Sequence, residues 1–153
     1  CKKVNINIKV FQQCLPNQNN FLEDVYKKNN IEFEVFNFTH DIKKYFSKID
    51  FAITRAGSSM LAELLNCRIP ILSIPLPSSA DNHQLKNAKF FQKKGYSFLI
   101  EEKEINEKLL PLIKSVHRDK EILNLMKSKQ KLHTDKNVFI RVFDETKNLI
   151  DND

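Results

Sequence analysis

The sequence lacks any apolar run approaching the roughly 20 residues that span a bilayer, so it predicts no transmembrane segment. Its three cysteines form no CxxC pair and show no metal-ligand spacing with the four histidines. We therefore expect no bound metal ion. An odd number of cysteines without a disulfide framework favours a reducing cytosol.

Signatures of common hydrolases are also missing. There is no GxSxG motif and no pair of carboxylates at glycosidase spacing. Internal repeats and low-complexity linkers are absent too. The missing hydrolase motifs leave a hydrolase function with little support.

The charge is strongly basic, with a net +6 at pH 7 and an isoelectric point near 9.2. This balance favours anionic partners: nucleic acid, acidic lipid headgroups or a nucleotide diphosphate. The lysines are dispersed, and they are not interleaved with aromatic residues as on a single-strand-binding platform. Such lysines are typical of solvated helix faces. A nucleic-acid-binding module stays an alternative, which predicts steeply salt-dependent affinity.

The chain of 153 residues predicts one domain, residues 1–153, with a sizeable core. Hydrophobic residues at 41% and charged residues at 29% are ordinary for a globular protein. The sequence begins without Met, and its opening CKKVNINIKV is too polar for a signal peptide. We expect it to be an N-terminally truncated fragment of a longer protein.

Strand and helix patterns alternate along the first hundred residues. Predicted strands are Val4–Phe11, Ile31–Phe38, Phe51–Ile53, Ile71–Ile74 and Ser97–Ile100. Predicted helices are Phe21–Lys28, Asp41–Ser47, Ser58–Asn66 and a helix from Asp81 to Lys94. The wholly apolar Phe51–Ile53 is expected to be a central strand, and Ser97–Ile100 an edge. Repeated strand–helix–strand units predict an α/β fold with a doubly wound, mostly parallel, Rossmann-like sheet covered by helices on both faces.

Local signals suggest how these helices begin and end. Asn20 with Glu23 resembles a capping box, and Thr39 and Asp81 are expected to cap the helices that follow them. Gly95 is placed just beyond the end of the helix that closes at Lys94. In the Asp81–Lys94 helix, the side chains expected to face inward are Leu85, Ala88, Phe90 and Phe91.

From Glu104 onward the pattern is helical only, which predicts a helical C-terminal tail with three amphipathic stripes. The first stripe is Ile105, Leu109, Leu112, Ile113 and Val116. The second is Ile122, Leu125, Met126 and Leu132, and the third is Val138, Phe139, Val142, Phe143 and Leu149. Core packing is the usual role of such stripes.

The stretch Phe51–Gln84 carries the candidate chemistry. Arg55 and Gly57 lie between a strand and a helix, where free N–H groups of Ser58 and Ser59 and the helix dipole favour a phosphate. Glu63 lies one to two turns further on and can accept hydrogen bonds from ribose hydroxyls. On spacing alone, an ordinary structural role for these residues is an equal alternative: a surface ion pair, a turn and a solvated carboxylate.

A second polar loop follows the next strand. His83, Gln84 and Asn87 offer imidazole and amide groups suited to sugar hydroxyls, although ordinary helix capping also explains them. Phe38 and Thr39 close an earlier strand-to-helix turn, where an aromatic ring can pack on a base or, more commonly, in the core. The two loops of Phe51–Gln84 make one candidate site, because parallel strands end at the same edge of a sheet.

The run TRAGSSMLAELLNCRIPILSIPLPSSADNHQLKNA resembles the C-terminal, donor-binding domain of the bacterial peptidoglycan N-acetylglucosaminyltransferases of glycosyltransferase family 28. The preceding VFNFTHDIKKYFSKIDFAITRAG, the later GYSFLIEE and the helical tail extend the resemblance over nearly the whole chain. It implies the C-terminal half of a GT-B glycosyltransferase, lacking the first strand of that domain and its glycine-rich loop. His83 stands where some members have Gln, and Cys67 and Arg68 replace the usual small residue and Gly before the Pro.

The resemblance also implies roles for individual residues. Those facing the UDP diphosphate would be Arg55, Gly57, Ser58 and Ser59, with Glu63 on the ribose. Phe38, Thr39 and Ile42 would line the uracil pocket, and His83, Gln84 and Asn87 would contact the GlcNAc and the phosphate. The catalytic base is expected in the N-terminal acceptor domain, which this sequence does not contain.

The implied activity is inverting transfer of GlcNAc from UDP-GlcNAc to undecaprenyl-diphospho-MurNAc-pentapeptide, which converts lipid I to lipid II in peptidoglycan synthesis. No cofactor, metal ion or nucleic acid is expected. The implied location is the cytoplasmic face of the bacterial inner membrane, as a peripheral protein whose basic charge suits an anionic leaflet. An alternative is a non-catalytic UDP-GlcNAc-binding subunit of a dolichol-linked-type GlcNAc transferase. The coding sequence upstream of Cys1 would separate the two.

Overall fold

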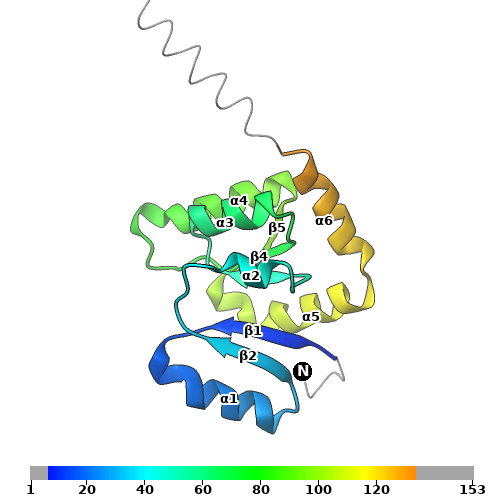
Figure 1. Ribbon diagram of the computed structural model, residues 1–153. Helices are drawn as coiled ribbons and strands as arrows, with labels where there is room; N and C mark the ends of the chain where they lie inside the picture. The colour runs from blue at the N-terminus through cyan, green and yellow to red at the C-terminus, as the bar shows by residue number, and fades with distance from the viewer. Residues whose placement is uncertain (1–6, 134–153) are drawn as a thin grey trace, which may run out of the picture.

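The computed structural model describes residues 7–133, in which strands and helices alternate up to the fifth strand and helices follow (Figure 1). The strands are β1 (Lys9–Gln13), β2 (Glu32–Phe36), β3 (Ala52–Thr54), β4 (Ile71–Ser73) and β5 (Ser97–Leu99). The helices are α1 (Asn19–Lys28), α2 (Lys43–Phe46), α3 (Ser58–Asn66), α4 (His83–Lys94), α5 (Ile105–Arg118) and α6 (Glu121–Lys131). Short 3₁₀ turns precede α1, α4 and α5: η1 (Pro16–Gln18), η2 (Ala80–Asn82) and η3 (Glu102–Glu104).

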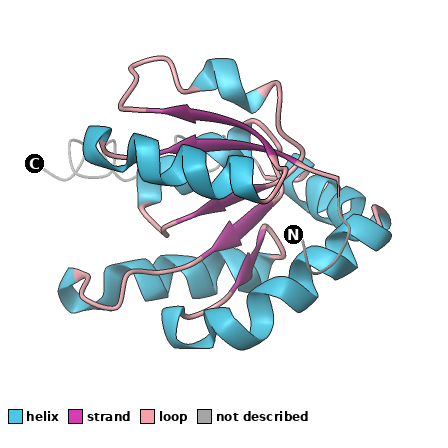
Figure 2. Ribbon diagram, turned by 90° about the horizontal axis from the view of Figure 1, so that it is seen from below, coloured by secondary structure: helices cyan, strands magenta, loops and turns pink. Residues whose placement is uncertain are grey.

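All strand pairs are parallel, but the five strands form two sheets instead of one. One sheet has the order β1-β2 and the other β3-β4-β5. Within the second sheet, Thr54 aligns with Ser73 and Ser73 with Leu99, so three strands end level with one another. Figure 2 shows helices on both sides of the strands. The predicted parallel α/β class is therefore confirmed.

A groove of about 830 Å³ lies between β1 and β3, with Ile113 and Val116 of α5 also in its lining. Because β3 has only β4 as a described strand neighbour, it is an edge strand, and its Ile53 is 50% exposed. The prediction of Phe51–Ile53 as a covered central strand is thus wrong for residues 7–133. The central strand of this sheet is β4, whose three residues are all buried.

The core forms on both faces of the β3-β4-β5 sheet. On one face, Leu61 and Leu64 of α3 pack with Ile71 and with Ala88 of α4. On the other, Leu72 packs with Ile105 and Leu109 of α5. The predicted buried side of α3 is confirmed, as Leu61, Leu64 and Leu65 are each at most 4% exposed. Burying such aliphatic side chains stabilises the fold by about 1.5–3 kcal/mol each.

Three helices end in a residue with left-handed backbone: Asn30 after α1, Arg68 after α3 and Gly95 after α4. At α3, the N–H of Arg68 bonds to the carbonyl of Leu65, and that of Ile69 to the carbonyl of Leu64, both at 3.0 Å. This is the Schellman pattern, which favours glycine in the left-handed position. Arg68 has φ of 56°, so it adopts the left-handed conformation although its Cβ makes that conformation unfavourable.

Other local predictions need correction. The capping box of Asn20 and Glu23 does not form, since α1 begins at Asn19 and Glu23 pairs with Lys27 at 3.0 Å. Thr39 accepts a hydrogen bond from the Asp41 N–H at 3.1 Å, but α2 itself begins later, after Ile42. The Glu23 carboxylate is thus engaged by a lysine side chain, and the Thr39 hydroxyl holds a backbone N–H of the turn in front of α2.

On α6 the buried face differs from the second predicted stripe, which was Ile122, Leu125, Met126 and Leu132. Its buried residues are Leu123, Met126 and Gln130, whereas Leu125 is 63% exposed. Gln130 Nε2 donates to the carbonyls of Ile69 and Tyr96, each at 2.9 Å, which turns this polar residue inward. Leu132 is 80% exposed as well, and on α4 Phe90 points outward at 55% exposure. The stripe at residues 138–149, together with Val4 and Ile6, lies outside the described residues.

Relief of the backbone strain at Arg68 gives a direct test of the α3 terminus. We expect Arg68→Gly to raise the free energy of unfolding by about 1 kcal/mol, because glycine adopts the left-handed conformation without steric cost. Asn66→Gly, two residues earlier in regular helix, should lower it by about 0.5–1 kcal/mol. Urea denaturation of the unaltered chain and the two variants measures both changes. A loss of stability in Arg68→Gly would contradict the claim that the backbone at Arg68 is strained.

Candidate functional site

The β3–α3 loop carries Arg55, Gly57, Ser58 and Ser59 at the carboxyl end of β3. Gly57 is the N-cap residue of α3, and among residues 7–133 no side chain accepts a hydrogen bond from the first turn of the helix. Ser58 and Ser59 are exposed there. The N-terminus of this nine-residue helix is therefore an uncapped set of N–H donors that faces solvent beside a cationic side chain.

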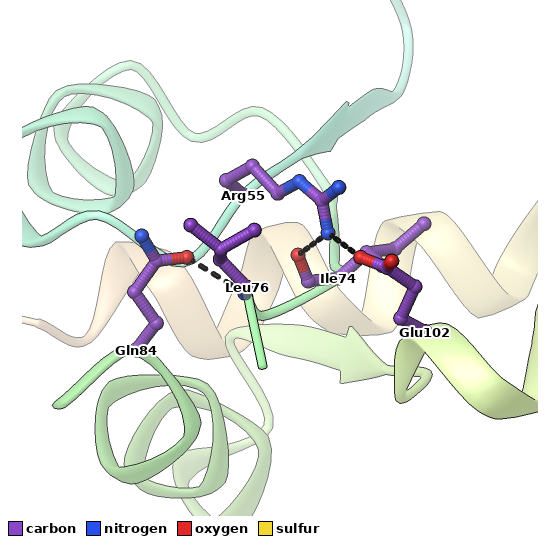
Figure 3. A network of polar contacts seen from close by, with 5 residues as sticks. All are labelled: Arg55, Ile74, Leu76, Gln84 and Glu102. Carbon is purple, nitrogen blue, oxygen red and sulfur yellow. Dashed lines mark hydrogen bonds and ion pairs between the residues drawn. The ribbon is translucent and has the colours of Figure 1, made fainter. Parts of the chain in front are cut away.

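The guanidinium of Arg55 is held at the ends of two neighbouring strands (Figure 3). Its Nη1 donates to the carbonyl oxygen of Ile74, just beyond β4, at 3.4 Å. The same nitrogen donates to Glu102 Oε2, in the turn after β5, at 2.5 Å. Nε and Nη2 point away from Glu102 and have no hydrogen-bond partner among residues 7–133. Arg55 can therefore offer two further nitrogens, which carry three N–H donors, to a ligand.

Gly57 has an ordinary extended backbone, with φ of −69° and ψ of 135°. A Cβ added at this position would meet no atom within 4 Å. Neither backbone conformation nor packing therefore requires glycine here. The absence of a side chain instead leaves open space at the start of α3.

Glu63 lies on α3, just under two turns after Gly57, and its side chain is half-buried. Its carboxylate makes no hydrogen bond or ion pair within the described part of the chain. It remains an available acceptor at the side of the helix.

The second loop lies at the end of β4 and enters α4 through η2. Gln84 Oε1 accepts a hydrogen bond from the Leu76 N–H at 2.9 Å, which closes the loop after β4 (Figure 3). Asn87 Nδ2 donates to the carbonyl of Ala56 at 3.1 Å, so it joins α4 to the β3–α3 loop. His83 is exposed, with Nδ1 2.8 Å from the carbonyl oxygen of Ala80.

Asp81 does not cap α4 as predicted. Asp81 and Asn82 both adopt left-handed backbone, with φ of 48° and 53°, and α4 begins at His83. The Gln84 N–H instead approaches Ser79 Oγ at 3.4 Å. Asp and Asn tolerate the left-handed region better than most residues, which explains the tight turn in front of α4.

The third group of predicted residues follows β2 in the other sheet. Phe38 is 74% exposed and lies edge-on to the His40 ring, with ring centroids 4.9 Å apart. It is not a core residue. Thr39 is half-buried, and Ile42 lines the same groove as Arg55. An exposed aromatic ring at a strand end suits stacking on a base.

The structure thus brings the two loops after β3 and β4 together through Asn87 and the Arg55–Ile74 hydrogen bond. Phe38 and Thr39 make no hydrogen bond to either loop within residues 7–133. Sequence reasoning missed Glu102, which contacts Arg55 across 47 positions of sequence. The available signal was an acidic residue just after the last strand of a parallel sheet.

In the part of the chain that the structure describes, no three His, Cys, Asp or Glu side chains are placed to hold a metal ion. Cys14 and Cys67 are free thiols. No helix within residues 7–133 has the length and hydrophobicity that a bilayer crossing requires.

Residues 1–142 match the family model described as the glycosyltransferase family 28 C-terminal domain. A parallel α/β domain with polar loops at its strand ends is the general form of a nucleotide-binding domain. The chain belongs to the C-terminal domains of glycosyltransferase family 28.

Curated relatives have consistent names. The chain is 45% identical over 108 residues to the UDP-N-acetylglucosamine--N-acetylmuramyl-(pentapeptide) pyrophosphoryl-undecaprenol N-acetylglucosamine transferase of Pelagibacter ubique. It is 33% identical over 138 residues to the transferase of the same name from Rickettsia massiliae. These alignments cover 69% and 86% of this chain, but only 30% and 37% of the relatives. The chain therefore spans about a third of their length.

Among solved structures, the crystal structure of MurG from Acinetobacter baumannii is similar, with a TM-score of 0.75 and 25% identity. The alignment covers 87% of this chain and 39% of that protein. This agreement confirms the predicted fold: the C-terminal part of a MurG-like α/β glycosyltransferase.

Asn87 offers a test of the connection between the two loops. We expect Asn87→Ala to lower the free energy of unfolding by about 1 kcal/mol, because the carbonyl of the fully buried Ala56 loses its donor. Lys86→Ala, at the exposed neighbouring position, is the control and should change stability far less. Equal urea midpoints for Asn87→Ala and the unaltered chain would contradict a stabilising connection.

Proposed function

We propose that this chain is the donor-binding domain of an inverting N-acetylglucosaminyltransferase that transfers GlcNAc from UDP-GlcNAc to an undecaprenyl-diphosphate-linked muramoyl-pentapeptide. One observation carries the proposal: Arg55, with two uncommitted guanidinium nitrogens, lies beside the uncapped N-terminus of α3. Together they make a diphosphate site without a metal. The names of the relatives supply the sugar and the acceptor.

In this proposal each loop has a separate task. The β3–α3 loop binds the diphosphate through Arg55 and the N–H groups of Ser58 and Ser59, and Glu63 accepts hydrogen bonds from the ribose. The second loop, with His83, Gln84 and Asn87, faces the GlcNAc and the adjoining phosphate. Phe38, Thr39 and Ile42 form the uracil pocket. These assignments are supported by the position of all three groups after parallel strands.

The chemistry asked of these residues is stabilisation of a leaving group. As the acceptor hydroxyl attacks the anomeric carbon, negative charge accumulates on the departing UDP. Arg55 and the positive end of the α3 dipole stabilise that charge, which is the usual role of preorganised donors in group transfer. The base that takes the acceptor proton would come from a separate acceptor domain, as would the contacts to the lipid-linked substrate.

The proposed location is the cytoplasmic face of the bacterial inner membrane, where the lipid-linked acceptor resides. The net charge of +6 favours association with an anionic leaflet. The relatives from Pelagibacter ubique and Rickettsia massiliae are both named as N-acetylglucosamine transferases acting on an N-acetylmuramyl-(pentapeptide) pyrophosphoryl-undecaprenol, which favours this function over a non-catalytic subunit of a dolichol-linked pathway.

The groove between β1 and β3 supports one further element of the proposal. Both strands have an unpaired edge there within the described residues, and the 830 Å³ groove is lined by β1, β3 and α5. In a doubly wound sheet, the chain starts at the centre and moves outward in both directions. A strand preceding β1 in the complete protein would occupy this centre and join the two sheets.

Glu63 provides the test of nucleoside binding. We expect Glu63→Ala in the complete enzyme to raise the KM for UDP-GlcNAc by about tenfold or more, because hydrogen bonds to a charged group contribute about 1.5–3 kcal/mol. The KM for the lipid-linked acceptor should stay unchanged. Steady-state kinetics with each substrate varied in turn measures both constants.

Glu63→Gln is the matched variant, since it keeps one acceptor oxygen and removes the charge. Its donor KM should fall between those of the unaltered enzyme and Glu63→Ala. An unchanged donor KM in Glu63→Ala would remove the ribose assignment.

A further inference from the structure

The contact between Arg55 and Glu102 connects three strand ends of one sheet. Arg55 follows β3, Ile74 follows β4, and Glu102 opens the η3 turn after β5 (Figure 3). Glu102 Oε2 accepts from Arg55 Nη1 at 2.5 Å, and the Ile74 carbonyl lies 3.4 Å from the same nitrogen. The guanidinium is thus held on one side by a carboxylate and a backbone oxygen.

The turn that carries Glu102 is itself fixed. The Glu101 N–H donates to Glu104 Oε2 at 3.1 Å, and the Glu104 N–H donates to the Glu101 carbonyl at 2.8 Å. Lys108 pairs with Glu104 at 2.5 Å, which lowers the pKa of that carboxyl below its usual range. Glu101 pairs with Lys103 at 3.2 Å. In this acidic turn, Glu102 is the carboxylate that contacts Arg55.

Stability of the fold does not explain the Arg55–Glu102 pair. The two side chains are 50% and 43% exposed. Ion pairs as exposed as this contribute little to folding. Its effect is on geometry: with Nη1 occupied by oxygen acceptors, only Nε and Nη2 of Arg55 remain for another anion.

We propose that Glu102 is a positioning residue for Arg55, which holds the guanidinium so that Nε and Nη2 meet the diphosphate of the donor. This inference rests on the proposed function. An arginine held in its binding orientation loses less side-chain entropy when the ligand arrives, so preorganisation increases affinity. Glu102 also carries a negative charge near the expected phosphate. If repulsion between its carboxylate and the phosphate dominated, Glu102 would weaken the binding of the diphosphate. The two roles predict opposite effects of its removal.

The experiment compares UDP with uridine, because only UDP carries the phosphates that Arg55 would bind. In the complete protein, isothermal titration calorimetry measures the Kd of both ligands for the unaltered chain, Glu102→Ala and Glu102→Gln. We expect Glu102→Ala to weaken UDP binding about fivefold, the size of effect that ordering one long side chain produces. Uridine binding should be unchanged. Glu102→Gln, which keeps an acceptor oxygen for Nη1, should recover part of the loss.

Glu107→Gln is the control for charge, since it removes one carboxylate from the exposed first turn of α5 without contacting Arg55. It should bind UDP like the unaltered protein.

Tighter or unchanged UDP binding in Glu102→Ala would overturn the positioning role, as would an equal loss for UDP and uridine. Failure of the unaltered protein to bind UDP would overturn the proposed function and this inference with it, whereas normal UDP binding with no effect at Glu102 overturns this inference alone.

Discussion

The parallel register of β3, β4 and β5 is the constraint on which the rest of the site depends. Because Thr54, Ser73 and Leu99 are aligned, the residues that follow each strand emerge at one edge of the sheet. Burial of β4 between two hydrophobic clusters fixes this register, since a shift by one residue would exchange the two faces of the strand. Arg55 and Glu102 meet only because the backbone has this alignment.

Side-chain to backbone hydrogen bonds then complete the arrangement. Asn87 holds the β3–α3 loop against α4, and Gln84 closes the loop after β4. These bonds leave the first turn of α3 uncapped and Gly57 without a packing role. The structure therefore holds Arg55 and the start of α3 in place through contacts that leave Arg55 Nε and Nη2 and the first N–H groups of α3 available.

Much of this fold was predictable from local pattern. Period-two alternation located β2, and the spacing of Leu61, Leu64 and Leu65 correctly identified the buried side of α3. The first strand was predicted at Val4–Phe11, but β1 spans Lys9–Gln13, so its bounds were wrong among the described residues. The predictions failed where contacts between residues distant in sequence determine the position of a side chain. Gln130 is buried because two remote carbonyls accept its amide hydrogens, which no periodicity indicates. Glu102 reaches Arg55 only through the sheet register. Site residues Arg55, Gly57 and Glu63 followed from motif and resemblance, and their ligand roles stay predictions.

The central claim is that the uncapped start of α3 and Arg55 together bind a diphosphate. The most direct measurement is a crystal structure of the complete protein with UDP. We expect the diphosphate to lie within hydrogen-bond distance, about 2.7–3.2 Å, of the Ser58 or Ser59 N–H and of Arg55 Nε or Nη2. Arg55 Nη1 would stay on Glu102. Electron density that places UDP away from this helix terminus, with Arg55 making no contact to phosphate, would contradict it.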